Sequence, residues 1–422
     1  MSLWSSGGWV RPWNWRAGRK AGCGHNCPPH CGLGICFLAL VGVQAAFGAS
    51  GPVEFGLAEF QAANATRKWP VKIKTELSLD QPETFRIEPY TAGGGRVTGG
   101  DLRGLMYGLI EAAGQMRTLG RLKPTRGVPA TPLRGVRFKV APADMEQPWF
   151  SSETFWRIYF QTLARSRFNR FSLAAPSLLE PASRLCMLSQ LAASYGIDFT
   201  LGLPEPAGDP VTLRARLGSI LAACPSIRGI ELDAGSAPLE WYRDAVLRTI
   251  ETAGRRVTLD LHNPAGDLHN PAGRADLTSA LIQAAVEANL PIRVSSLSGC
   301  KEALGLPEGS CYWALREPVV GDPESIRGRM PDLTADGSSG FEMEAPRDEG
   351  DAPASFHGPQ ELFYWVWGRM SYDPKAPAAP PVDAPSPPKA PAPAKPVAVP
   401  TGQGVAKPGT SKAPNGAASG RP

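Results

Sequence analysis

The sequence predicts an α/β fold: a (β/α)8 TIM-type barrel, preceded by a small α+β domain and followed by a disordered proline-rich tail. Three observations predict it. Strand-like and helix-like segments alternate between residues 132 and 373, which indicates parallel strand pairing. The alternation contains eight strand-like segments, and eight strand–helix units in about 240 residues are typical of this barrel. A content of 42% hydrophobic and 20% charged residues excludes a wholly disordered or fibrous chain.

Eight segments have the pattern of barrel strands: residues 134–140, 169–175, 198–204, 228–234, 255–261, 291–297, 311–317 and 340–346. Most are separated by segments whose apolar residues recur with the 3.6-residue period of a helix. The first such stripe contains Phe155, Ile158 and Leu163, and the last contains Leu362 and Met370. The connection after the sixth strand is short and irregular, and the one after the seventh shows no clear helix.

The small domain is expected over residues 50–131. Residues 71–77 and 84–90 alternate apolar and polar side chains, as half-buried strands do, and the glycines at 93–95 predict a turn. A helix is expected over residues 99–120, with Asp101 as its N-cap. Its apolar stripe contains Leu102, Leu105, Met106, Leu109 and Ala113.

Residues 1–49 are expected to be a leader. The segment is basic, then cysteine-rich, then apolar from residue 33 to Ala49, and a run of 17 residues is short for a membrane span. We expect a cleaved export signal and hence a periplasmic or extracellular protein. The alternatives are an uncleaved anchor, the only membrane contact that the sequence suggests, and a cytoplasmic head. The leader's cysteines lack the paired spacing of zinc sites, so no metal is expected there.

The tail, residues 374–422, holds 14 prolines among 49 residues and predicts disorder. The net charge of +5 belongs to the two ends, because residues 50–373 sum to −4. No nucleic-acid partner is therefore expected. Outside the leader, the four cysteines Cys186, Cys224, Cys300 and Cys311 allow disulfides without requiring them. The sequence does not define an oligomeric state.

Charged residues alternate with the apolar residues of the predicted strands. If the apolar side chains face the helices, the interior receives the charged and polar ones: Arg137, Lys139, Glu231, Asp233, Asp260, His262, Arg293, Ser295, Arg316, Glu342 and Glu344. Barrel interiors are normally apolar, so these groups must be paired or hydrated. Two interpretations stay open: an ion-pair network joining the strands, and an acid-lined pocket at the carboxyl-terminal mouth.

Several carboxylates around one pocket suit glycoside cleavage, in which one carboxylic acid protonates the leaving oxygen and a carboxylate activates water or attacks the sugar. We expect Asp233 as the general acid and Asp260 or Glu344 as the base. Lys139, His262, Arg316 and Trp313 are expected to bind the carbohydrate substrate, and Trp149, Trp241 and Trp367 are further candidates for stacking on sugars. No cofactor is expected. His262 and His269 lie in a duplicated loop, residues 262–273, interpreted as surface turns.

Several motifs carry a family resemblance. Residues 99–116 resemble the helix that closes the N-terminal domain of family 20 β-hexosaminidases and family 67 α-glucuronidases. Residues 134–140, 155–173 and 196–204 resemble the start of the barrel of bacterial α-glucuronidase-like proteins, and residues 361–374 resemble its last helix. The resemblance implies hydrolysis of terminal, uronic or N-acetylated sugars.

One part of this sequence departs from both families. Family 20 enzymes have an Asp-Glu pair after the fourth strand and family 67 enzymes have a catalytic Glu there, whereas this chain reads ELDAGSAP over residues 231–238. Asp233 or Glu231 would have to substitute for the missing acid. A catalytically degenerate barrel that serves as a carbohydrate-binding or scaffold protein is therefore the alternative.

Overall fold

The computed structural model describes residues 51–65, 70–91, 93–174, 181–203, 209–233, 237–262, 274–296, 306, 309–315, 323–346 and 359–377. The expected leader, residues 1–49, lies outside the described residues, as do His269, Arg316 and the tail beyond residue 377. Among the described helices, none combines the length and the apolar character needed to cross a lipid bilayer.

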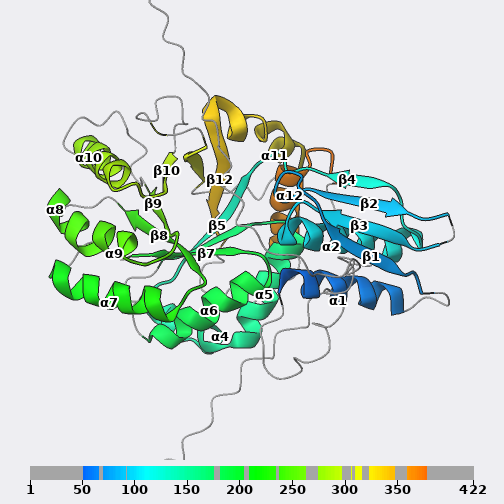
Figure 1. Cartoon of the computed structure of the whole chain (residues 1–422), viewed down its shortest axis with the longest axis horizontal. Coiled ribbons are helices and arrows are strands. Elements are labelled where there is room, and N and C mark those ends of the chain that lie inside the picture. Colours follow the sequence, from blue (N-terminus) through cyan, green and yellow to red (C-terminus); the bar gives the residue numbers. More distant parts are fainter. Residues whose placement is uncertain are drawn as a thin grey trace, which may run out of the picture. The chain divides into compact units, whose positions relative to one another are not determined.

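Eight parallel strands form a closed barrel, which confirms the predicted fold (Figure 1). In chain order the strands are β5 (Leu133–Lys139), β6 (Arg170–Ala174), β7 (Asp198–Gly202), β8 (Ile227–Asp233), β9 (Thr258–His262), β10 (Ile292–Ser296), β11 (Cys311–Leu315) and β12 (Ser338–Glu344). Each pairs with its neighbours in chain order, and β12 closes the barrel against β5. Their carboxyl ends therefore meet at one mouth.

Helices cover the outside of the barrel. They are α5 (Glu153–Arg165), α6 (Ala182–Ser194), α7 (Pro210–Ala223), α8 (Leu239–Tyr242), α9 (Arg248–Glu251), α10 (Arg274–Glu287), α11 (Pro323–Arg329) and α12 (Pro359–Tyr372). The π-helical turn η1 (Arg243–Leu247) joins α8 to α9. Two short helices, α3 (Pro142–Met145) and α4 (Pro148–Ser151), precede α5.

The connection after β11 differs from the prediction. It contains α11 and a 3₁₀ helix, η2 (Asp332–Gly337), where no clear helix was expected. Helix α11 has seven residues and buries only Ile326, so it is too short to show an apolar period in the sequence. On the outside of the barrel, Cys186 of α6 forms a disulfide with Cys224, which follows α7.

The small domain is a four-stranded sheet with two helices. The sheet has the order β1 (Ile73–Leu77), β3 (Gly95–Gly99), β2 (Phe85–Pro89), β4 (Thr125–Gly127), and the helices are α1 (Pro52–Ala65) and α2 (Leu102–Leu119). As predicted, the side chain of Asp101 caps α2, because it accepts a hydrogen bond from the Gly104 backbone N–H at 2.6 Å. Leu102 was expected in the apolar stripe but is exposed.

Strand β3 was not predicted, because two of its five residues are glycines. Gly99 is required there by close packing: a Cβ atom on it would lie 2.3 Å from the backbone nitrogen of Leu105. Helix α1 was also not predicted. It packs against α2 and buries Phe55 and Phe60.

Three glutamates of the small domain, each beside two arginines, join it to the barrel. Glu59 contacts Arg117 and Arg165, Glu83 contacts Arg103 and Arg134, and Glu111 contacts Arg167 and Arg369. Four of these arginines belong to the barrel domain: Arg134, Arg165, Arg167 and Arg369. The small domain is thus fixed to the barrel by buried ion pairs.

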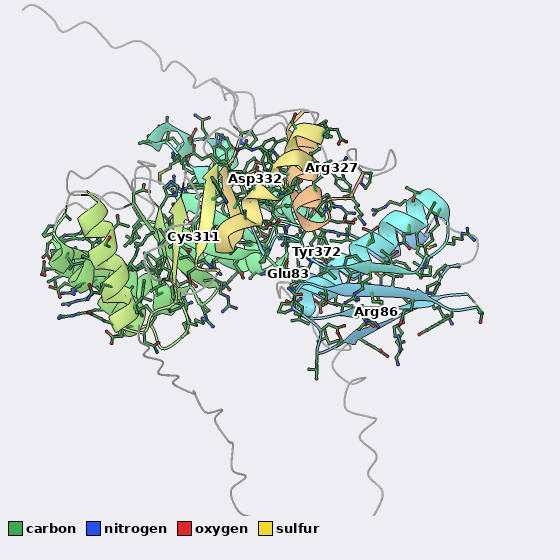
Figure 2. All side chains as sticks on the ribbon, turned by 90° about the horizontal axis from the view of Figure 1, so that it is seen from above. Glu83, Arg86, Cys311, Arg327, Asp332 and Tyr372 are labelled. Carbon is green, nitrogen blue, oxygen red and sulfur yellow. A yellow bond between two sulfur atoms is a disulfide. The ribbon has the colours of Figure 1, made fainter. Side chains whose placement is uncertain are left out.

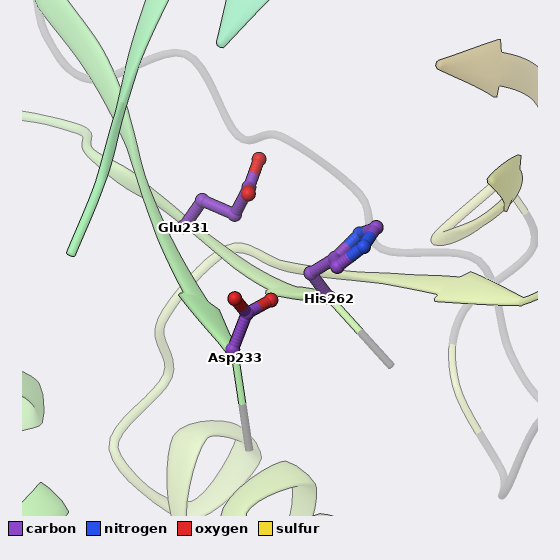
Figure 3. A group of neighbouring side chains, drawn as sticks. All are labelled: Glu231, Asp233 and His262. Atoms are coloured by element: carbon purple, nitrogen blue, oxygen red, sulfur yellow. The ribbon is translucent and has the colours of Figure 1, made fainter. Parts of the chain in front are cut away.

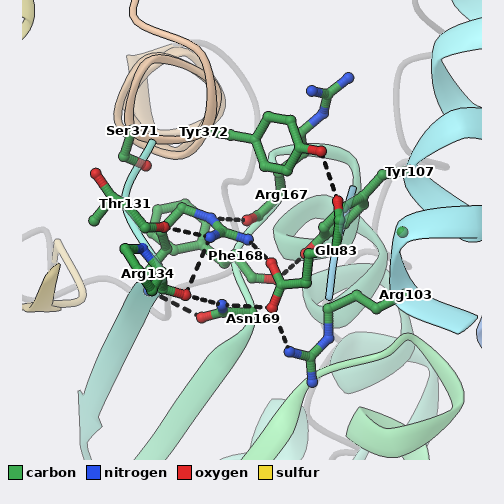
Figure 4. A network of polar contacts seen from close by, with 12 residues as sticks. Glu83, Arg103, Tyr107, Thr131, Arg134, Arg167, Phe168, Asn169, Ser371 and Tyr372 are labelled. Carbon is green, nitrogen blue, oxygen red and sulfur yellow. Dashed lines mark hydrogen bonds and ion pairs between the residues drawn. The ribbon is translucent and has the colours of Figure 1, made fainter. Parts of the chain in front are cut away.

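Glu83 has the densest set of these contacts (Figure 4). Its carboxylate also accepts a hydrogen bond from Asn169 Nδ2 at 2.9 Å, and its backbone carbonyl accepts one from the Tyr372 hydroxyl at 2.7 Å. Figure 2 shows Glu83 and Tyr372 close together, whereas Arg86 lies on the exposed face of β2. The link therefore joins a small-domain loop to the end of α12.

Candidate active site

The barrel interior is polar, as the strand alternation predicts. Six of the expected inward residues are buried: Arg137, Glu231, Asp260, His262, Ser295 and Glu342. Val136 and Phe138, predicted to face the helices, are buried in the hydrophobic core. Because so many ionisable groups share the interior, their mutual contacts determine their charge states.

The deeper layer of this interior centres on Arg170 of β6. Its Nη1 lies 2.9 Å from Asp260 Oδ1, and its Nε lies 3.2 Å from Glu342 Oε1. Its guanidinium also lies over the ring of Tyr312, 5.0 Å from the centroid. The sequence prediction missed Arg170, although the same alternation in β6 indicates it: Phe171 and Leu173 face the helices, which leaves Arg170 and Ser172 inside.

The deep carboxyl groups have perturbed pKa values. Burial raises the pKa of Asp260, although Arg170 opposes this. Burial also raises the pKa of Glu342 to about 7, again against the attraction of Arg170. For Glu231 burial acts in the same direction, but Arg137 and other nearby cations outweigh it, so the pKa is lowered. Glu342 can therefore hold a proton near neutral pH.

The upper layer lies at the carboxyl ends of three strands and is partly exposed. Asp233 ends β8, Lys139 ends β5 and Glu344 ends β12, and their side chains are 34%, 51% and 24% exposed. Arg137 Nη2 lies 3.4 Å from Asp233 Oδ1, and Arg137 Nη1 lies 3.8 Å from Glu344 Oε1. Lys139 Nζ lies 2.6 Å from Glu344 Oε1. One buried guanidinium therefore contacts both carboxylates of the mouth.

Asp233 has the electrostatics of a proton donor. Burial raises its pKa, Arg137 opposes this, and the negative charge of Glu231 adds to the increase. A carboxyl group with a raised pKa holds its proton to a higher pH, as a general acid must. Since Asp233 is one-third exposed, a ligand at the mouth can reach it.

His262 lies beside Asp233 and Glu231 (Figure 3). Its ring Nδ1 is 3.1 Å from the Ser295 hydroxyl, and the pairing of β8 with β9 places it opposite Asp233. One ligand atom from each of Glu231, Asp233 and His262 lies within 4.8 Å of the others, close enough for the three to hold a metal ion. A cation there would compete with Arg137, which already contacts both carboxylates.

Asp260 does not lie where the sequence analysis placed it. Strand pairing sets it level with Glu231, one layer below the mouth, where it is fully buried and bound to Arg170. Two of the tryptophans proposed to stack on sugars, Trp149 and Trp367, are core residues. Trp241 packs against Tyr242 beside the core. Trp313 of β11, which was expected to bind the substrate, lies on the helix-facing side of the strand: it pairs with Phe341 and packs against the core, whereas the adjacent Tyr312 faces the interior.

Solved structures of glycoside hydrolases share this fold. A GH138 enzyme targeting pectin rhamnogalacturonan II aligns with a TM-score of 0.61 at 15% identity, covering 78% of this chain and 50% of that one. The GH115 4-O-methyl-α-glucuronidase BtGH115A, with specificity for decorated arabinogalactans, gives 0.50 at 13%, covering 78% and 56%. CpGH84D gives 0.51 at 11%, covering 79% and 65%.

These likenesses establish the fold. The chain spans between half and about two thirds of the length of the enzymes it matches. No protein-family model matches the sequence, and no curated protein matches it either. The comparisons therefore show a fold that this chain shares with glycoside hydrolases, while membership of family 20 or family 67 stays a prediction.

Proposed function

We propose that the protein is a glycoside hydrolase in which Asp233 is the general acid and Glu344 is the general base or nucleophile. The observation that carries this proposal is the position of Arg137, whose guanidinium contacts both carboxylates at the mouth of the barrel. Enzymes with this fold place their chemistry at that end. Glycoside cleavage needs two carboxyl groups in different protonation states around one bond.

The two carboxyl groups have different surroundings, as the mechanism requires. The pKa of Asp233 is raised by burial, so it can donate a proton to the departing oxygen. Glu344 faces two cations, Lys139 and Arg137, so its carboxylate is paired with positive charge. Asp260 has no comparable access to a sugar, and we assign it with Arg170 and Glu342 to the support beneath the site.

The substrate we propose is a terminal sugar that carries an acidic group. Lys139 is half exposed at the mouth, where its ammonium group can pair with a uronic carboxylate. His262, at the end of the neighbouring strand β9, would contact the sugar, and Arg316, which follows β11, is proposed as a second cation. By their descriptions, the GH138 enzyme of similar fold targets pectin rhamnogalacturonan II, and the GH115 enzyme is a 4-O-methyl-α-glucuronidase with specificity for decorated arabinogalactans.

We also propose that the protein is exported. The disulfide between Cys186 and Cys224 supports this, because such bonds persist in oxidising compartments outside the cytosol. The assignment agrees with the apolar leader expected over residues 1–49. Fractionation of cells that express the full chain, with the redox state of the cysteines measured in each fraction, tests it.

Release of sugar by the full-length protein tests the catalytic proposal. Aryl glycosides of glucuronate, galacturonate, xylose and N-acetylglucosamine form the panel, with the variants Asp233→Asn and Glu344→Gln. Glu240→Gln is the matched control, since Glu240 lies exposed on α8. We expect turnover with at least one glycoside, lost by about a hundredfold or more in both site variants and kept in the control. Saturable sugar binding without turnover would instead support the non-catalytic alternative.

A further inference from the structure

A cavity lies at the end of the barrel opposite the candidate site, where the strands begin. It has a volume of about 510 Å³. The amino ends of β5, β6, β7, β10 and β12 line it together with Glu83 and Arg103 of the small domain. The volume lies in the range of pockets that bind small molecules. The deep layer around Arg170 separates it from the mouth carboxylates.

Three arginines line this cavity, and two of them are already paired. Arg103 bridges Glu83 Oε1 at 2.6 Å and Asp198 Oδ1 at 3.0 Å. Arg170 is held by Asp260 and Glu342. The third, Arg293, is half-buried near the start of β10, opposite Asp260 of β9, and its charge acts to lower the pKa of Asp260. Within the described part of the chain, however, no group lies at hydrogen-bond or ion-pair distance from its guanidinium.

The rest of the cavity lining is polar. It includes the side chains of Ser338 and Ser339 and the backbone of Gly309. The Nε–H group of Arg103 has no acceptor among the described residues, but it is buried, so a ligand in the cavity would not reach it. Arg293 is therefore the group on which an anion in this cavity would depend.

We propose that this cavity binds a small oxyanion, a carboxylate or a phosphate, on Arg293. A guanidinium presents a planar fork of N–H donors that matches the two oxygens of such an anion. Of the three cations in the cavity, Arg293 is the one whose fork is not occupied by a carboxylate of the described chain. The anion would be either inorganic phosphate or the carboxylate of a free sugar acid. The site does not depend on the proposed hydrolytic activity.

Isothermal titration of the full-length protein with inorganic phosphate, D-glucuronate and neutral D-glucose tests the proposal. We expect saturable binding of phosphate or glucuronate, with the stronger ligand identifying the source of the anion. Arg293→Gln should weaken that binding by about tenfold or more, because a charge-assisted hydrogen bond is lost. Arg256→Gln, at an exposed arginine in a separate basal groove, should leave it unchanged.

Two further variants show that a loss of anion binding is not caused by unfolding and that binding does not occur at the candidate active site. Ser339→Leu fills the cavity without removing a charge and should also abolish binding, while the melting temperature shows that it is folded. Asp233→Asn should bind the anion as the wild type does. Absence of saturable binding to phosphate and glucuronate, or unchanged affinity in Arg293→Gln, would overturn the proposal.

Discussion

Arg137 of β5 and Glu231 of β8 form an ion pair across the interior of the barrel, with Arg137 Nε 2.5 Å from Glu231 Oε1. The two strands are not neighbours, because β6 and β7 lie between them. Both side chains are buried, so the pair spans the interior directly. The same guanidinium contacts Asp233 and Glu344, which couples the stability of the barrel to the geometry of the candidate site.

Replacing Arg137 by Met should therefore reduce both stability and activity. The variant leaves Glu231 buried without its main cation, and breaking a buried pair in this way costs about 3–5 kcal/mol. Urea denaturation measures the loss. Arg248→Met is the control: its ion pair with Asp244 is exposed, so its effect should stay within about 1 kcal/mol. Equal effects of the two substitutions would contradict a central role for Arg137.

Glu342 should make the protein less stable as the pH rises through neutrality. Its folded-state pKa is raised to about 7, mainly by burial, so the folded protein binds this proton more tightly than the unfolded chain does. The stability gained from the bound proton is complete below the unfolded-state pKa and is lost as the pH rises through about 7. The loss is at most about 3 kcal/mol, since one pKa unit corresponds to about 1.4 kcal/mol.

Glu342→Gln removes this titration and keeps the size of the side chain. Denaturation at a series of pH values should then show the variant gaining stability relative to the wild type between about pH 5 and pH 8. A constant difference between the two proteins over that range would show that Glu342 does not titrate there.

Glu83 should act in the opposite pH range. Burial alone would raise its pKa, but Arg134 and Arg103 lower it to about 2, so its stabilising effect is present above the unfolded-state pKa and is lost as pH falls toward 2. Glu83→Gln should cost about 3 kcal/mol near neutral pH and flatten the acid limb of the stability curve. Acid titration followed by circular dichroism checks this. Glu88→Gln, on the open face of β2, serves as its control, and a matching change there would argue against a special role for Glu83.

Removing the disulfide with the double variant Cys186→Ser, Cys224→Ser should destabilise the barrel by about 2–4 kcal/mol, because the bond closes a loop with a sequence separation of 38. Thermal unfolding of the oxidised wild type, the reduced wild type and the double variant measures this. The oxidised double variant isolates the effect of this bond, and the reduced wild type should melt no higher than it, because reduction also opens the disulfide of Cys311. If all three melt at the same temperature, the bond has no stabilising role.

The strand positions could be predicted because each strand alternates apolar residues for the helix layer with polar residues for the interior. This alternation correctly placed Arg137, Glu231 and Glu342 inside the barrel. It could not predict how far Asp260 lies below the mouth, because that distance depends on how adjacent strands are offset. The offset that pairs Glu231 with Asp260 is a property of the closed barrel. The tryptophans were equally ambiguous, since the sequence does not show that Trp149 packs against Phe138.

The connection between the domains could not be predicted for a similar reason. Glu83 follows a turn and looks like a surface residue in the sequence. It is buried because Arg134, at the start of the barrel, and Arg103, in α2, converge on it from distant parts of the chain. Such ion pairs leave no local periodic pattern in the sequence.

The dependence of hydrolysis on the leaving group tests the proposed mechanism most directly. With aryl glycosides of one sugar, kcat/KM of Asp233→Asn should fall steeply as the pKa of the departing phenol rises, because only poor leaving groups need a proton from the general acid. The variant should approach the wild type for the most acidic phenol. A loss that is the same for every phenol, or no loss at all, would contradict the assignment of Asp233 as the acid.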